Sequence, residues 1–151
     1  MADITRRAEV VWDGDLLHGS GTFNVGSGAL SDVAVSWPSR AAEPAGKTSP
    51  EELIAAAHAS CYAMALSHAL SEGGHAPERL TVSAVVTFAP LPAGGFKVAK
   101  SALSALSVQG VVPGLDEPAF AKWARQGEES CPVSNALRGN VEISLEATLE
   151  S

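Results

Sequence analysis

Cys61 is the first candidate for chemistry in this sequence. A cysteine attacks as the thiolate, and the surroundings of the thiol set its pKa and so the amount of thiolate. Cys61 stands about ten residues into a strongly periodic segment, where the dipole of a helix has faded. Activation would need a cation, and Arg40 is the arginine of the loop that leads into this segment. The alternative is an inert thiol packed among alanines, because free cysteine is often buried.

Cys131 is the second cysteine, within Ser130-Cys131-Pro132. We expect it at the N-terminal cap of a short helix, where backbone amides and the helix dipole stabilise a thiolate. Such a thiol suits either role in a dithiol pair, attack on a sulfenic acid or departure when a disulfide is reduced. A small residue that fills a helix junction is the alternative, because a separation of 70 residues does not fix a distance in space.

Two further side chains belong to the candidate chemistry. Glu51 precedes Cys61 by ten residues, about 15 Å along a straight helix, so it would act only through Arg40 or through a second chain. His58 precedes Cys61 by three residues, which allows a Cys-His dyad or the beginning of a metal site. The other histidines form no ligand spacing with Cys61, so a hydrogen-bonded, partly buried His58 is favoured and no metal site is predicted.

The segment 48–73 must position these residues, and its periodicity predicts a helix. Ser49 is the expected cap, with Pro50 in the first position and Glu52 completing a capping box. Gly73-Gly74 ends the segment. Small side chains in the middle turns let another backbone approach closely, so we expect a central helix packed on several sides. Its apolar face is predicted to be Leu53, Ala56, Ala57, Cys61, Met64, Ala65 and Ala69.

The rest of the chain alternates between strand and helix signals. The predicted strands are 4–12, 16–24, 29–37, 79–90, 95–108 and 141–149. An irregular loop is expected at 38–47, a turn at 111–118, a helix over 116–129 capped by Asp116, and a short helix over 132–137. This order (βββ-α-ββ-αα-β) predicts an α+β fold with antiparallel sheets covering the helices instead of alternating βαβ units. The length of the chain predicts a single domain, 1–151.

Composition narrows the classes of function. The chain is 46% hydrophobic and 18% charged, with a formal net charge of -7. That charge argues against nucleic acid or an anionic membrane as a partner. No apolar leader and no stretch of 18 apolar residues is seen, so we expect a cytoplasmic protein. In a reducing compartment two cysteines are more often catalytic, redox-active or simply buried than a structural disulfide.

With these residues in view, the chain resembles the OsmC/Ohr family of thiol-dependent hydroperoxide reductases, and the OsmC branch more than the organic hydroperoxide resistance branch. The resemblance covers nearly the full length. Its motifs are Trp12-Asp13-Gly14-Asp15 with Gly19-Ser20-Gly21, Thr48-Ser49-Pro50-Glu51-Glu52-Leu53-Ile54, Ala57-His58-Ala59-Ser60-Cys61, Val112-Pro113-Gly114-Leu115-Asp116 and Cys131-Pro132-Val133-Ser134. The combined order and spacing of these motifs are highly specific.

The resemblance implies an intertwined homodimer whose sheets wrap the central helices, with two active sites at the interface. Cys61 would be the peroxidatic cysteine, Cys131 the resolving one, Arg40 the group that stabilises the thiolate, and Glu51 the carboxylate that orients Arg40. The substrate would be an organic hydroperoxide, with inorganic peroxide reduced less efficiently. No cofactor is implied, and an external dithiol, for example a lipoyl protein, would regenerate the enzyme. A Cys-His hydrolase using Cys61 and His58, and a non-catalytic dimeric stress protein, remain alternatives.

Overall fold

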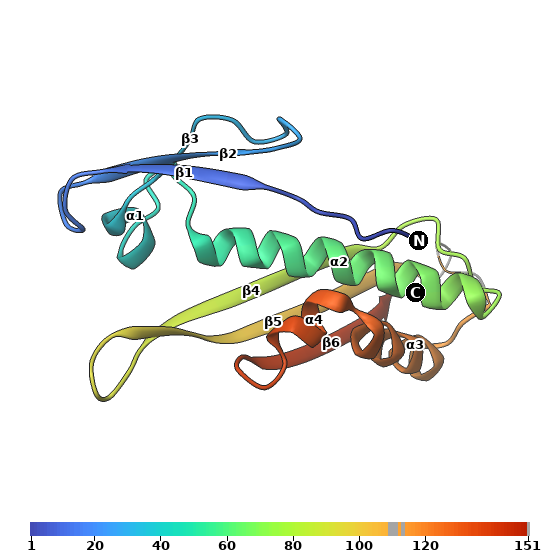
Figure 1. The fold of residues 1–151 in the computed structure, drawn as a ribbon. Coiled ribbons are helices and arrows are strands. Elements are labelled where there is room, and N and C mark those ends of the chain that lie inside the picture. Colours follow the sequence, from blue (N-terminus) through green and yellow to red (C-terminus); the bar gives the residue numbers. More distant parts are fainter. Residues whose placement is uncertain (109–111, 113, 151) are drawn as a thin grey trace. The chain divides into compact units, whose positions relative to one another are not determined.

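The computed structural model describes residues 1–108, 112 and 114–150. Contacts divide the chain into two compact units, Met1–Leu53 and Ile54–Ser151, and each is described by itself. Figure 1 labels their helices and strands in chain order. The single domain expected from chain length stays a prediction.

The first unit is built on an antiparallel sheet in the order β1-β2-β3. The predicted strands exist, but each begins later than expected. Between β1 and β2 the Asp15 carboxylate accepts hydrogen bonds from the backbone N–H groups of Leu17 and His18, each at 2.9 Å. These bonds satisfy the amides locally and hold the turn residues out of the sheet. The bounds are β1 Ala8–Asp13, β2 Ser20–Val25 and β3 Val33–Val35.

The prediction of an irregular loop at 38–47 is wrong for the first part of that segment, because Trp37–Ala41 form helix α1. The Ser36 hydroxyl accepts a hydrogen bond from the Ser39 N–H at 3.3 Å, and the Ser39 hydroxyl accepts one from the Ser36 N–H at 3.2 Å. Two serines thus form a reciprocal capping box. In sequences this motif is usually identified from a Glu or Gln at the N3 position, which is a serine here. Arg40 is therefore carried by a helix.

The long helix α2 spans Pro50–Glu72 and confirms the predicted helix with its Ser49 cap, whose hydroxyl accepts from the Glu52 N–H at 3.2 Å. The predicted apolar face is wrong in part. The buried stripe contains His58, Tyr62 and Leu66, each 0% exposed, whereas Met64 is 68% exposed. Because apolar side chains occur on all sides of α2, their spacing does not mark one face.

By length and composition α2 could also cross a membrane, with a window of mean hydropathy 1.3. The core helix of a globular protein passes the same test, so length and composition decide little. The stripe of α2 packs into the main hydrophobic core, and His58 on it is hydrogen bonded to serine side chains. We therefore interpret α2 as a core helix.

The second unit contains a sheet in the order β4-β5-β6, formed by Thr81–Pro90, Phe96–Val108 and Glu142–Glu150. The hairpin of β4 and β5 is antiparallel, as expected. The prediction of wholly antiparallel sheets is wrong for β6, which pairs parallel to β5. The chain crosses over through α3 and α4 before β6, and such a crossover lets a strand return in the same direction. The fold is therefore α+β with one antiparallel and one mixed sheet.

Helices α3, Glu117–Ser130, and α4, Pro132–Leu137, meet at Cys131 (Figure 1). Asp116 caps α3 as predicted, by accepting from the Ala119 N–H at 2.9 Å. Helix α3 lies close on α2, because a Cβ added at Gly127 would stand 3.0 Å from the Cα of Leu66. The core of this unit is Tyr62, Leu66 and Leu70 of α2, Leu103 and Ala105 of β5, Phe120 and Ala124 of α3, and Leu149 of β6.

The segment expected to turn the chain at 111–118 is described in part. Val112 and Leu115 are both buried in the core. Residues 111 and 113 of this segment, the second of them Pro113 of the Val112–Asp116 motif, lie outside the described residues.

Candidate functional site

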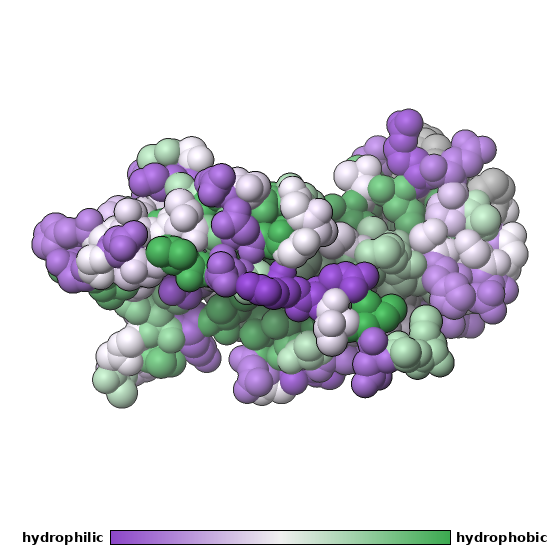
Figure 2. Space-filling view, turned by 45° about the horizontal axis from the view of Figure 1, so that its top comes forward, coloured by the Kyte–Doolittle hydropathy of each residue, from purple (hydrophilic) through white to green (hydrophobic). Residues whose placement is uncertain are grey.

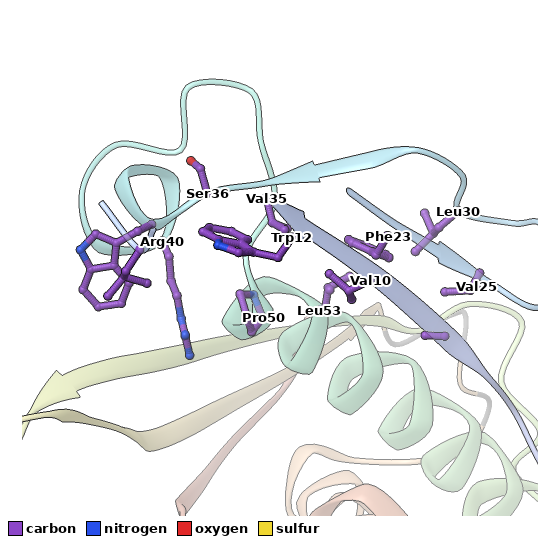
Figure 3. Close-up of a pocket in the computed structure, with 13 residues that line it drawn as sticks. Val10, Trp12, Phe23, Val25, Leu30, Val35, Ser36, Arg40, Pro50 and Leu53 are labelled. Carbon is purple, nitrogen blue, oxygen red and sulfur yellow. The ribbon is translucent and has the colours of Figure 1, made fainter. Parts of the chain in front are cut away.

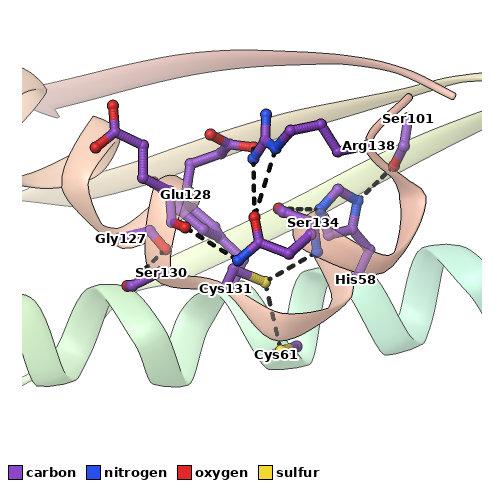
Figure 4. A network of polar contacts seen from close by, with 12 residues as sticks. His58, Cys61, Ser101, Gly127, Glu128, Ser130, Cys131, Ser134 and Arg138 are labelled. Atoms are coloured by element: carbon purple, nitrogen blue, oxygen red, sulfur yellow. Dashed lines mark hydrogen bonds and ion pairs between the residues drawn. The ribbon is translucent and has the colours of Figure 1, made fainter. Parts of the chain in front are cut away.

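The two cysteines lie side by side, which their separation in the sequence did not establish. The sulfurs of Cys61 on α2 and Cys131 at the α3–α4 junction are 3.4 Å apart, and both are free thiols (Figure 4). Cys131 is fully buried, whereas Cys61 is partly exposed. Because a disulfide bond is about 2.05 Å long, only a small approach of the two sulfurs would be needed when an oxidant takes up the two electrons and two protons of the thiols. The pair is thus poised for reversible dithiol chemistry.

The first turn of α4 donates to both sulfurs. The Ser134 N–H lies 3.5 Å from the Cys131 sulfur, which confirms Cys131 as the N-cap of α4. The Val133 N–H donates to the Cys61 sulfur and lowers the pKa of that thiol. Burial has the larger effect and raises the pKa of Cys61, and the neighbouring Cys131 raises it further. The surroundings of Cys61 within its own unit therefore favour the neutral thiol.

Arg40 and Glu51, the two charged residues singled out from the sequence, form an ion pair within the first unit. The guanidinium Nη2 lies 2.7 Å from Glu51 Oε1, and Nε lies 3.1 Å from both carboxylate oxygens. The side chain of Glu51 is 8% exposed and that of Arg40 is 33% exposed. Helix α1 carries the arginine and the first turn of α2 carries the carboxylate. This geometry fits a carboxylate that holds a guanidinium in one orientation.

The four candidate residues thus form two pairs. Arg40 with Glu51 belongs to Met1–Leu53, and Cys61 with Cys131 belongs to Ile54–Ser151. That the guanidinium serves the thiol stays a prediction.

An open cavity of about 480 Å³ lies within the first unit. Figure 3 shows Arg40 at the end of this cavity away from Leu30, with Val10 and Phe23 between them. The cavity is large enough for a small organic molecule. Its lining is mostly apolar, with Val10, Trp12, Phe23, Val25, Leu30 and Leu53 among the residues that form it.

His58 is a satisfied core histidine, as favoured from the sequence, and not a partner of Cys61. Its Nδ1 lies 2.7 Å from the Ser101 hydroxyl and its Nε2 lies 2.7 Å from the Ser134 hydroxyl (Figure 4). Burial lowers the pKa of His58, with a smaller opposing effect from Glu128. Because both ring nitrogens are engaged by hydroxyls, the predicted alternative of a Cys61–His58 dyad has no geometric support.

The sequence reasoning missed Ser101 and Ser134, which are both 0% exposed. A signal for Ser101 was present, because the alternation of β5 places it on the same face as the buried Leu103 and Ala105. Ser134 follows Cys131 by three residues, the spacing at which a helix amide meets its cap. Neither signal alone pointed to His58.

Comparison with known proteins gives consistent matches. The family model described as "OsmC-like protein" matches residues 43–146. The chain is 36% identical to "Peroxiredoxin OsmC" of Escherichia coli (strain K12) over 148 residues, 98% of this chain and 99% of that protein.

Two solved structures are similar over almost the whole chain. The organic hydroperoxide resistance protein OhrB of Bacillus subtilis has a TM-score of 0.73 at 29% identity, covering 94% of this chain and 98% of that chain. An organic hydroperoxide resistance protein OsmC from Legionella pneumophila has a TM-score of 0.72 at 26% identity, with both chains covered completely (100%).

Proposed function

Because the chain belongs to the OsmC-like protein family, we propose that it is a cysteine-based peroxidase that reduces organic hydroperoxides to alcohols. The observation that carries this proposal is the pair of free thiols, Cys61 and Cys131, with sulfurs 3.4 Å apart. Relatives named for peroxiredoxin activity and for organic hydroperoxide resistance support the same chemistry.

The reaction runs in three balanced steps. The Cys61 thiolate attacks the distal oxygen of the hydroperoxide, the O–O bond breaks, and the alcohol leaves as Cys61 becomes a sulfenic acid. The Cys131 sulfur then attacks that sulfenic sulfur, which forms the disulfide and releases water. An external dithiol reduces the disulfide by thiol exchange and is itself oxidised. A lipoyl-type protein would supply such a dithiol.

Arg40 has the role of stabilising the Cys61 thiolate and the negative charge on the departing oxygen. This role is needed because burial raises the pKa of Cys61, so that a cation must offset the cost of the charged form. Glu51 orients the guanidinium through the bonds of 2.7 and 3.1 Å. Glu51 lies about 15 Å from Cys61 along α2 at about 1.5 Å per residue, so it acts through Arg40 or from a second chain.

The cavity of the first unit supports an organic substrate over an inorganic one. Its apolar lining offers burial to an alkyl or aryl group, and Arg40 stands at one end of it. Hydrogen peroxide has no such group and gains nothing from that lining, so we expect it to be reduced less efficiently.

The active form is a homodimer. Figure 2 shows hydrophobic residues on the visible face of the molecule. Apolar side chains occur on all sides of helix α2, and the side away from its buried stripe leaves Met64 68% exposed. Such a helix is normally covered all round. The large apolar side chains that are more than half exposed include Val10 59%, Val11 57%, Leu16 55%, Leu17 61%, Met64 68% and Val85 66%.

Light scattering on a size-exclusion column would measure the mass of the assembly. We expect twice the chain mass of 15.4 kDa, and a Met64→Lys variant that dissociates. A Ser71→Lys change at the exposed end of the same helix serves as the control. A wild-type protein that elutes as a monomer at all concentrations would refute the dimer. We place the protein in the cytoplasm. Because its net charge is -7, neither nucleic acid nor an anionic membrane is proposed as a partner.

The function is tested by mixing the reduced protein with cumene hydroperoxide. We expect two thiols per chain to be consumed with formation of a Cys61–Cys131 disulfide, and turnover when a dithiol is added. Cys61→Ser should abolish turnover, and Cys131→Ser should leave a sulfenic acid that dimedone traps. Thiols that stay unchanged for minutes would refute the proposal.

The pH dependence of Cys61 alkylation separates this enzyme from a protein with inert thiols. We expect the thiol of the assembled protein to react well below pH 8.5, which is about the pKa of an unperturbed cysteine, and Arg40→Met to shift that profile upward. Equal profiles for wild type and Arg40→Met would remove Arg40 from the mechanism. Hydrolysis of an activated ester that persists in Cys131→Ser would instead support a hydrolase.

A further inference from the structure

A line of buried polar side chains runs from the sheet to the turn that holds Cys131. It begins at Ser101 on β5, passes through His58 on α2 and ends at Ser134 on α4, and all three are 0% exposed. Both contacts of the imidazole with the hydroxyls are 2.7 Å long. Polar groups in such a place are costly unless bonded, so this line fixes the relative positions of three elements.

Ser134 joins this line to the redox centre. Its hydroxyl contacts His58 Nε2, while its own N–H lies 3.5 Å from the Cys131 sulfur. Its carbonyl accepts from the Arg138 N–H at 2.9 Å, which closes the turn of α4. The side chain that binds His58 therefore belongs to the same residue whose backbone meets the sulfur of Cys131 (Figure 4).

A second anchor holds α4 on its exposed side. Arg138 Nη2 lies 2.6 Å from Glu128 Oε1, and Asn135 Nδ2 donates to the Glu129 carbonyl at 3.1 Å. The side chain of Arg138 is 49% exposed and that of Glu128 is 13% exposed, so water screens this ion pair from the arginine side. The buried contact between Ser134 and His58 is thus the stiffer of the two anchors.

The position of α4 matters because disulfide closure is demanding in distance. The sulfurs are 3.4 Å apart, and they must approach to about 2.05 Å. A displacement of about 1 Å in a reacting group lowers a rate by as much as about a hundredfold.

We propose that His58 is a positioning residue for Cys131. Through Ser134 it holds the first turn of α4 so that the Cys131 sulfur stays within reach of the Cys61 sulfur. The step that it governs, which rests on the proposed function, is attack of Cys131 on the Cys61 sulfenic acid, with formation of one S–S bond and loss of one water. Attack of Cys61 on the hydroperoxide depends on it less, because only the Val133 N–H of this turn donates to the Cys61 sulfur.

The test uses Ser134→Ala, which removes the hydroxyl and keeps the backbone N–H. Reduced protein is mixed with cumene hydroperoxide, quenched at intervals, and analysed by mass spectrometry for dimedone-trapped sulfenic acid and for disulfide. We expect sulfenic acid to form at a rate within about twofold of wild type and disulfide to close about tenfold more slowly. Ser130→Ala, at the exposed serine beside Cys131, is the matched control and should behave as wild type.

Two further variants separate positioning from general damage. Ser134→Thr restores a hydroxyl and should recover most of the closure rate, whereas Ser101→Ala should slow closure less, because it frees only the far end of the imidazole. Thermal unfolding of each variant is measured in parallel. Closure rates that follow the melting temperature and not the presence of the Ser134 hydroxyl would overturn the proposal.

Oxidation by diamide tests the positioning without hydroperoxide, because diamide takes up the two hydrogens of a dithiol directly. We expect Ser134→Ala to form the Cys61–Cys131 disulfide more slowly with diamide also. If the wild type does not react with hydroperoxide but forms the disulfide with diamide faster than Ser134→Ala does, the peroxidase proposal fails and the positioning inference stands. Equal closure rates in wild type and Ser134→Ala with diamide would refute the inference.

Discussion

The ion pair of Arg40 and Glu51 makes a quantitative prediction about the stability of the first unit. Substituting each residue by methionine, singly and together, gives a double-mutant cycle whose coupling free energy reports the pair alone. Methionine keeps an unbranched side chain of similar length and removes the charge. The single variant Arg40→Met leaves a carboxylate that is 8% exposed without that guanidinium.

The coupling can be bounded from the geometry. At an effective dielectric constant of about 20, two unit charges about 4 Å apart attract by about 4 kcal/mol. Arg40 is 33% exposed, so water screens a good part of this. Hydrogen bonds to charged groups contribute about 1.5–3 kcal/mol. The helix dipole of α2 favours Glu51 by about 0.3–1 kcal/mol, and this contribution survives in Arg40→Met.

We therefore expect each single variant to lose about 2–3 kcal/mol of unfolding free energy, the double variant about 3 kcal/mol, and a coupling of about 2 kcal/mol. Urea unfolding at one fixed protein concentration measures all four proteins, because association makes stability depend on concentration. The exposed pair Lys100–Glu142, at 3.6 Å, is the control and should couple by no more than about 0.5 kcal/mol. A coupling for Arg40–Glu51 as small as that of the control would refute the reasoning.

Three other expectations follow from particular contacts. Gly127→Ala should lower the unfolding free energy by about 1–3 kcal/mol, because the new methyl would stand 3.0 Å from the Leu66 Cα. Urea unfolding measures this change. An unchanged midpoint would mean that α2 and α3 make room for the methyl at no cost. Stability should fall as pH drops below about 6.5, because burial lowers the pKa of His58 and the unfolded chain then binds the extra proton. His58→Asn should flatten that slope between pH 7.5 and 5.5, and a slope unchanged in the variant would assign it to other groups. Val10→Trp fills the cavity, so it should raise KM for cumene hydroperoxide and leave turnover of hydrogen peroxide unchanged. Val11→Trp, on the opposite face of β1, is the control and should change neither. Equal effects of the two variants would show that the cavity does not bind the substrate.

The predictions that held were those with local causes. The cap of α2 at Ser49, the start of α3 at Asp116 and the place of Cys131 before α4 each depend on a few neighbouring residues. The predicted start of the second strand at residue 16 is wrong for a local reason too. The Asp15 carboxylate accepts hydrogen bonds from the Leu17 and His18 N–H groups, so these residues form a turn and not part of the strand.

The failures came from features that depend on distant partners. The direction of β6 is set by the crossover through α3 and α4, and no residue of 142–150 encodes it. The buried stripe of α2 could not be predicted from spacing, because apolar side chains occur on every side of this helix and the stripe includes the polar His58. The 3.4 Å contact of Cys61 with Cys131 likewise depends on the packing of α3, where Gly127 meets α2 at Leu66.

The environment of Cys61 bears on the proposed division of activation and resolution between different parts of the chain. Burial and the neighbouring Cys131 raise the pKa of Cys61, so the close approach of the second thiol disfavours the Cys61 thiolate. A cation within the same core would have to be buried as well, at a cost of several kcal/mol. The guanidinium on α1 is 33% exposed and is paired with Glu51, so its desolvation costs less than that of an unpaired cation in the core. The second unit thus contributes a closely spaced dithiol, and the proposed activation of Cys61 would need a charge that the first unit carries on Arg40.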